Sequence, residues 1–202
     1  MNYNKIYKEN KQSWGEQPNE LLPLILADLK SGLRFLDLGC GQGRDSFFMA
    51  RKNFKVTAVD ESEVAISDIG TEMKKIKLRN RIKTVCSDVN NFKIVKNNYD
   101  IINTVNTLHF LKKADASVIL KRIKYGLKKN GFFVFIDFTP KDPSFKKKGR
   151  EQNGYFTSQE LSILFSKFKI VFCREEWLKD MGHPGYEKPH RHHLVKLIAQ
   201  KV

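Results

Sequence analysis

Short apolar runs alternate with longer amphipathic stretches along most of the chain. The short runs are rich in β-branched and aromatic residues and predict strands, at residues 34–38, 55–60, 82–86, 99–105, 131–138, 169–174 and 193–199. Between them, apolar positions recur every three or four residues and predict helices, at residues 19–30, 45–52, 63–77 and 114–127 and from Ser158 onward. Such alternation of strands and helices predicts an α/β fold with a parallel sheet.

The composition is that of a globular chain of ordinary size. Its 202 residues suit one α/β domain, and 41% of them are hydrophobic, which is enough for a core. No run approaches the roughly 18–20 apolar residues of a membrane span, and the first residues show no secretory signal. Three widely separated cysteines disfavour a disulfide framework and a cysteine-based zinc site. We therefore expect a soluble, cytoplasmic protein without a membrane partner.

The net charge of +15 raises the question of a nucleic-acid partner. Of the 37 basic residues, 28 are Lys and 9 are Arg, although Arg is the better bidentate reader of phosphates and base edges. The lysine runs fall where solvated helix ends and loops are expected, and residues 139–153 have a linker's composition. A solvated surface is therefore the favoured interpretation, and a nucleic-acid footprint is the alternative.

A glycine-rich turn follows directly on the first predicted strand. Its spacing over residues 39–43 is G-x-G-x-G, whereas a dinucleotide site has G-x-G-x-x-G. Asp37, two residues before the first glycine, would repel a pyrophosphate but suits a cation such as the ammonium of a methionine moiety. Asp60 ends the second strand, where a carboxylate accepts hydrogen bonds from a ribose. Asp88 ends the third strand, where it is placed to accept from an adenine amine.

Four segments in register resemble the successive motifs of class I S-adenosylmethionine-dependent methyltransferases. They are LDLGCGQGR at 36–44, VTAVDES at 56–62, CSDV at 86–89 and YDIINTVNTLHFL at 99–111. The resemblance covers nearly the whole chain. It implies that the cofactor is S-adenosyl-L-methionine and that S-adenosyl-L-homocysteine is its product.

Three further segments resemble the tellurite-resistance-type (TehB-like) small methyltransferases. They are WGEQPNE at 14–20, GYFT at 154–157 and PHRHH at 189–193. The resemblance implies a single doubly wound, Rossmann-like domain over residues 1–202. Its seven-stranded, mostly parallel sheet has the order 3-2-1-4-5-7-6 and an antiparallel last strand. We expect an N-terminal lid and helix at 1–30, a cofactor-binding core at 33–138 and a substrate-side part at 139–202.

The cofactor should lie over the carboxyl ends of the first four strands. The residues expected to bind it are Trp14, Asp37, Gly39, Gly41, Gly43, Arg44, Asp60, Glu61, Ser62, Asp88, Val89 and Thr104. Five of these assignments have structural alternatives. Asp37 could cap the turn, Asp88 could be a turn residue, and Trp14 could staple the N-terminal segment to the core. Glu61 and Ser62 could only begin the next helix, with Ser62 as its N-cap.

The expected acceptor is a small molecule: a thiol, an amine or a chalcogen oxyanion. His193 and Arg191, and beyond them His109, are the candidate catalytic residues on the substrate side, because they bind anions or take protons near neutral pH. A structural role for His109 stays open. No metal is expected, on the reasoning that HxH and HH spacings on an extended chain point neighbours to opposite faces.

Three other functions stay open at this stage. They are methyl transfer to RNA or another macromolecule, binding of S-adenosylmethionine without catalysis, and nicotinamide-dependent oxidoreduction, which the glycine spacing disfavours. The oligomeric state is not predicted.

Overall fold

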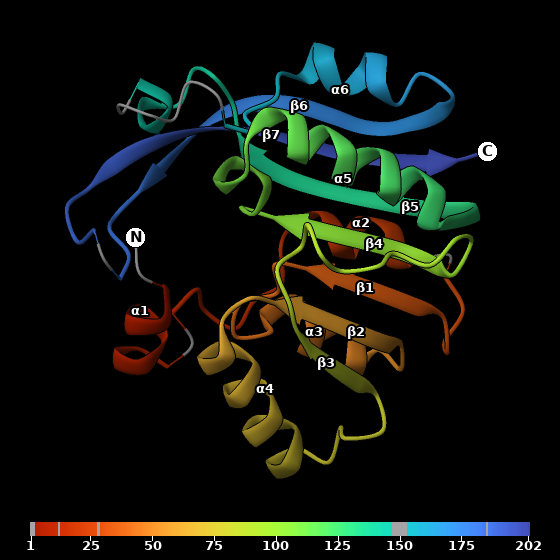
Figure 1. Ribbon diagram of the computed structural model, residues 1–202, viewed down its shortest axis with the longest axis vertical. Coiled ribbons are helices and arrows are strands. Elements are labelled where there is room, and N and C mark those ends of the chain that lie inside the picture. Colours follow the sequence, from red (N-terminus) through yellow and green to blue (C-terminus); the bar gives the residue numbers. More distant parts are fainter. Residues whose placement is uncertain (1–2, 12, 28, 147–152, 185) are drawn as a thin grey trace.

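A computed structural model describes residues 3–11, 13–27, 29–146, 153–184 and 186–202. It contains one seven-stranded sheet of order β3-β2-β1-β4-β5-β7-β6 (Figure 1). The strands are β1 Arg34–Leu38, β2 Lys55–Asp60, β3 Ile82–Cys86, β4 Tyr99–Val105, β5 Leu127–Phe138, β6 Phe168–Asp180 and β7 His190–Lys201. The pairs among β1 to β5 are parallel, and β7 is antiparallel to both β5 and β6. The predicted fold class and strand order are confirmed.

Helices cover both faces of the sheet. They are α1 Tyr3–Glu9, α2 Leu21–Leu26, α3 Arg44–Arg51, α4 Glu63–Lys75, α5 Lys113–Gly126 and α6 Ser158–Leu164, with 3₁₀ turns η1 Leu108–Phe110 and η2 Pro143–Lys146. Successive residues of β1 point to opposite faces: Leu36 and Leu38 pack with α5 and α6, and Phe35 packs with α2 and α3. Figure 1 shows these two helical layers in front of and behind the sheet.

Several element boundaries differ from the prediction. The helix expected at 19–30 is confined to Leu21–Leu26, and Asn19 before it uses its side chain and backbone to bind Asp45. The expected linker at 139–153 begins as a buried turn, with Thr139 and Asp142 inaccessible to solvent, and its residues 147–152 lie outside the described residues. β6 and β7 are both much longer than the predicted strands at 169–174 and 193–199.

The extra length of β6 and β7 forms a hairpin that leaves the body of the sheet. The two strands stay paired from Phe168 with Lys201 to Asp180 with His190. In Figure 1 the hairpin curves toward α1, and the rings of Trp14 and His183 lie 5.2 Å apart. The hairpin and the N-terminal segment therefore face each other across the carboxyl ends of the strands. Within the described ranges, no helix has the length and apolarity that a membrane crossing requires.

Candidate functional site

A cavity of about 1390 Å³ lies over the carboxyl ends of β1 to β5. Residues that directly follow or end these strands form its floor: Gly39, Asp60, Asp88, Asn106 and Phe138. α1 with the segment after it, and the β6–β7 hairpin, form its walls. The carboxyl ends of parallel strands are the common ligand-binding edge of open α/β sheets, and the prediction placed the cofactor there.

The glycine loop between β1 and α3 requires glycine for two reasons. Gly39, Gly41 and Gly43 have φ of 71°, 51° and 84°, in the left-handed region that favours glycine. A Cβ on Gly39 would lie 2.2 Å from Thr107 Oγ1, and one on Gly41 would lie 2.9 Å from the Tyr7 hydroxyl oxygen. The loop therefore presents bare backbone to the cavity, and neighbouring groups approach it closely.

Asp60 ties the second strand to this loop. Its carboxylate accepts hydrogen bonds from the backbone N–H of Gly41 at 2.8 Å and of Ser62 at 2.9 Å. Burial raises the pKa of Asp60, although these two hydrogen bonds favour the charged form. Tyr7 lies beside this carboxylate, and burial together with Asp60 raises the pKa of the Tyr7 hydroxyl. Asp60 thus lines the cavity at the position predicted for a ribose contact.

A buried acidic cluster lies under the same loop. Asp37 accepts hydrogen bonds from Ser46 Oγ at 2.7 Å and Asn103 Nδ2 at 2.8 Å. Asp45 accepts from Asn19 and Asn103. Burial, reinforced by the neighbouring Asp45, raises the pKa of Asp37 to about 7. Two carboxylates in one desolvated cluster create a negative potential that a bound cation would relieve.

The other residues predicted to bind the cofactor divide into two groups. Trp14, Arg44, Glu61, Ser62, Asp88 and Val89 line the cavity with Asp37, Gly39, Gly41 and Asp60. Gly43 and Thr104 are not among the described residues that line it. Thr104 is fully buried in β4, and its assignment to cofactor binding stays a prediction. Ser62 is also the N-cap of α4, since its Oγ accepts from the Ala65 N–H.

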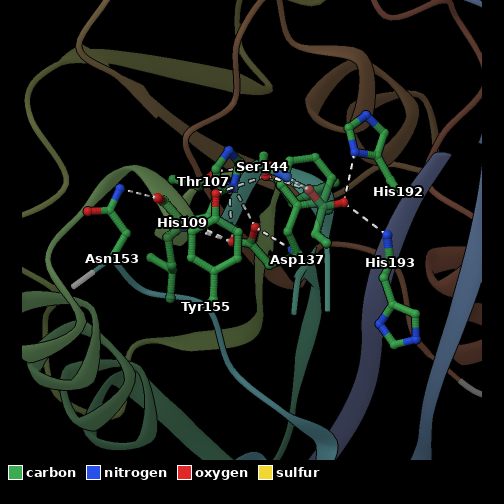
Figure 2. A network of polar contacts seen from close by, with 12 residues as sticks. Thr107, His109, Asp137, Ser144, Asn153, Tyr155, His192 and His193 are labelled. Carbon is green, nitrogen blue, oxygen red and sulfur yellow. Dashed lines mark hydrogen bonds and ion pairs between the residues drawn. The ribbon is translucent and has the colours of Figure 1, made fainter. Parts of the chain in front are cut away.

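His109 forms part of a buried network around Asp137. The His109 Nδ1 and an Asp137 carboxylate oxygen are 2.5 Å apart, and the second oxygen accepts from the N–H groups of Thr107, Leu108 and His109. Figure 2 shows these contacts converging on Asp137. Asp137 therefore holds both the η1 turn and the His109 ring in place. His109 itself lines the cavity. His109 thus makes a structural contact and also lines the cavity, and its catalytic role stays a prediction.

The β7 histidines point in different directions. His193 is buried, with Nδ1 2.6 Å from Thr139 Oγ1 and its ring edge-on to Trp177. Figure 2 shows the His192 and His193 side chains on opposite sides of the strand. The expectation that His193 lies on the substrate side is therefore wrong, whereas Arg191 and His192 do line the cavity.

The sequence interpretation also missed a histidine cluster at the hairpin. Residues two apart on a strand share a face, so the reasoning that separated His190 from His192 is wrong. Their Nε2 atoms are 2.8 Å apart, and Asp180 and His183 lie beside them. The HxH spacing could have predicted this cluster, because it matches the two-residue period of a strand.

The sequence matches the profile of one family, described as tellurite resistance protein TehB, over residues 25–171. A curated relative, the probable S-adenosyl-L-methionine-dependent methyltransferase TehB of Haemophilus influenzae, is 31% identical over 110 residues, which are 54% of this chain and 37% of the relative. The carboxy-S-adenosyl-L-methionine synthase of Haemophilus ducreyi is 29% identical over 118 residues, 54% of this chain and 48% of that protein. The chain thus matches less than half the length of either relative.

Among solved structures, the crystal structure of TehB from Haemophilus influenzae is similar in fold. It superposes with a TM-score of 0.73 at 23% identity, covering 90% of this chain and 60% of that one.

Proposed function

The chain belongs to the family of the tellurite resistance protein TehB, and from this premise we propose that it transfers a methyl group from S-adenosylmethionine to a small-molecule acceptor. One observation carries the proposal: a bare glycine loop and the carboxylates of Asp37, Asp60 and Asp88 line the same cavity. Relatives whose names include methyltransferase and carboxy-S-adenosyl-L-methionine synthase support it.

The residues around the cavity fit S-adenosylmethionine group by group. Gly39 and Gly41 line the cavity and expose backbone to it, so a ligand can approach the main chain there. Asp60 is placed to accept hydrogen bonds from ribose hydroxyls, and Asp88 from the adenine amine. The buried cluster of Asp37 and Asp45 provides the negative potential that an ammonium group needs.

When bound, S-adenosylmethionine supplies a methyl group already activated by a positively charged sulfur. The chain therefore has to orient the acceptor in line with that methyl group and to exclude water. Trp14 and Phe110 line the cavity from the N-terminal segment and the η1 turn, and the hairpin closes its other side. His109, held by Asp137, is the candidate base for an acceptor that arrives protonated.

The acceptor side of the cavity favours a small anion over a macromolecule. Arg191 lines this side, and its guanidinium is a group that binds anions. A chalcogen oxyanion or a thiolate is an anion that can bind there without losing a proton first. The carboxylates that this side offers an amine include those of Asp142 and Asp180, which already lie beside His192 and His190.

A screen with methyl-labelled S-adenosylmethionine tests the proposal. Label transfer to at least one of a set of thiols, amines, selenite and tellurite is expected. Transfer to RNA alone would identify a macromolecular methyltransferase that uses the +15 surface. Tight binding of S-adenosylmethionine with no transfer to any acceptor would instead indicate a binding module.

A further inference from the structure

Three histidines and one aspartate converge at the tip of the β6–β7 hairpin. Asp180 ends β6, His183 lies in the turn, and His190 and His192 begin β7. One ligand atom from each residue lies within 4.8 Å of every other. The strand pairing explains the convergence, since Asp180 and His190 are direct cross-strand partners and His192 follows on the same face.

Hydrogen bonds fix the orientation of each imidazole. Nδ1 of His192 is 2.9 Å from the buried carboxylate of Asp142, Nδ1 of His190 is 2.9 Å from the Lys188 carbonyl oxygen, and Nδ1 of His183 is 3.1 Å from the Pro184 carbonyl oxygen. An acceptor at Nδ1 requires the proton there, which leaves the lone pair on Nε2. Oxygen acceptors behind ligating histidines are the usual outer shell of metal sites in proteins.

The Nε2 atoms then face each other without a donor between them. Those of His190 and His192 are 2.8 Å apart, and His190 Nε2 is 3.9 Å from the Asp180 carboxylate. Two lone pairs at that distance repel unless a cation lies between them. Four donors around one point exceed what a shared proton needs, and they match a four-coordinate metal ion.

We propose that Asp180, His183, His190 and His192 form a binding site for one divalent transition-metal ion of the zinc type. Three imidazoles and one carboxylate suit Zn²⁺ and its neighbours, whereas Mg²⁺ and Ca²⁺ prefer oxygen ligands. A tetrahedral zinc with bonds of about 2.0–2.1 Å holds its donors roughly 3.3 Å apart. The ligand atoms here lie within 4.8 Å of one another, so closing on an ion changes their separations by at most about 1.5 Å.

Four protein donors fill a tetrahedral shell, which is the arrangement of a structural site. The bound ion would fix the turn of the hairpin over the cavity. It would also hold the N-terminal segment, because the His183 ring packs on Trp14. The inference stands independently of the methyl-transfer proposal, since it rests on the hairpin residues alone.

Metal titration of tag-free protein tests the site. A Cys86→Ser background removes the exposed thiol as a competing ligand. Calorimetric titration with Zn²⁺ should show one tight site per chain, and Zn²⁺ should raise the melting temperature. Co²⁺ should give the visible absorption of a tetrahedral ion. His190→Ala/His192→Ala should weaken Zn²⁺ binding at least a hundredfold, and His183→Asn about tenfold or more.

His193→Gln is the matched control, because it removes a histidine from the same strand but from its opposite face. This variant should bind Zn²⁺ within about threefold of the parent. Equal Zn²⁺ binding by the parent and the double variant, or a parent that binds no ion, would overturn the site and leave a proton shared between His190 and His192. Circular dichroism of each variant separates loss of the site from loss of the fold, and His183→Asn keeps the test open if the double variant unfolds.

Discussion

We expect the charge of Asp37 to serve a ligand rather than the fold. Its carboxyl is 3% exposed and beside Asp45, and burial raises its pKa to about 7. The folded chain therefore holds a proton that the unfolded chain releases near pH 4, so this group lowers stability as pH rises from about 4 to 7. Asp37→Asn keeps the shape and removes that loss.

We expect the free energy of unfolding of Asp37→Asn, measured with denaturant at pH 8, to be at least that of the parent. The difference between the two proteins should decrease toward pH 4. The same variant should bind S-adenosylmethionine at least tenfold more weakly, because its ammonium loses a charged partner. Between pH 5.5 and 7.5 the affinity of the parent should rise as Asp37 ionises, and that of the variant should not. A less stable variant with unchanged affinity would assign Asp37 to the fold.

Asp60 differs from Asp37 because it is expected to bind a ligand and also stabilises the glycine loop. Asp60→Ala removes the acceptor for the Gly41 and Ser62 N–H groups and for the expected ribose hydroxyls. Calorimetric titration should show S-adenosylmethionine affinity reduced tenfold or more, because a lost buried acceptor costs about 1–3 kcal/mol. An unchanged dissociation constant would mean that the ribose is bound elsewhere.

At the scale of elements, the turn after β1 and the η1 turn fit each other closely. Gly39→Ala places a Cβ against Thr107, whereas Gly32, with a similar φ of 83°, has nothing within 4 Å of its added Cβ. Gly32→Ala should therefore cost only the left-handed strain of about 1–2 kcal/mol. Gly39→Ala should lose a further 1–3 kcal/mol from overpacking, in the free energy of unfolding. Equal losses would show that Thr107 moves aside freely.

Arg191 and His193 share a face of β7, but among the described residues only Arg191 of the two lines the cavity, whereas His193 is buried. Arg191→Ala should lower turnover of a verified acceptor while leaving S-adenosylmethionine affinity within about twofold, as expected for a residue that contacts the acceptor. His193→Ala should instead lower the melting temperature, because it leaves the buried Thr139 hydroxyl without its partner. Wild-type turnover by Arg191→Ala would move the search for acceptor contacts to His109.

The sequence was sufficient for the first four strands. The predicted bounds of β1 to β4 coincide with the observed ones, because each is a short run rich in apolar and β-branched residues between turn signals. The hairpin was underestimated, since beyond the sheet β6 and β7 pair only with each other and carry charged and aromatic side chains. A prediction based on apolar runs therefore does not detect this part of β6 and β7.

At the scale of the whole molecule, the floor of the cavity was predictable and its walls were not. Asp37, Asp60 and Asp88 are placed by the ends of local strands, which the motifs identify. The walls depend on contacts far apart in sequence: α1 packs on α4, and Trp14 meets His183 across the cavity. Tyr7, buried beside Asp60, was not predicted as a site residue. It lies in a helix of seven residues, which is too short to show a helical period of apolar positions.

The large cavity over the strand ends should bind S-adenosylmethionine. Isothermal titration of one protein preparation with S-adenosylmethionine, S-adenosylhomocysteine and NAD measures this. We expect one site per chain for each of the first two ligands and no heat with NAD. Heat with NAD, and none with either of the other two, would contradict it.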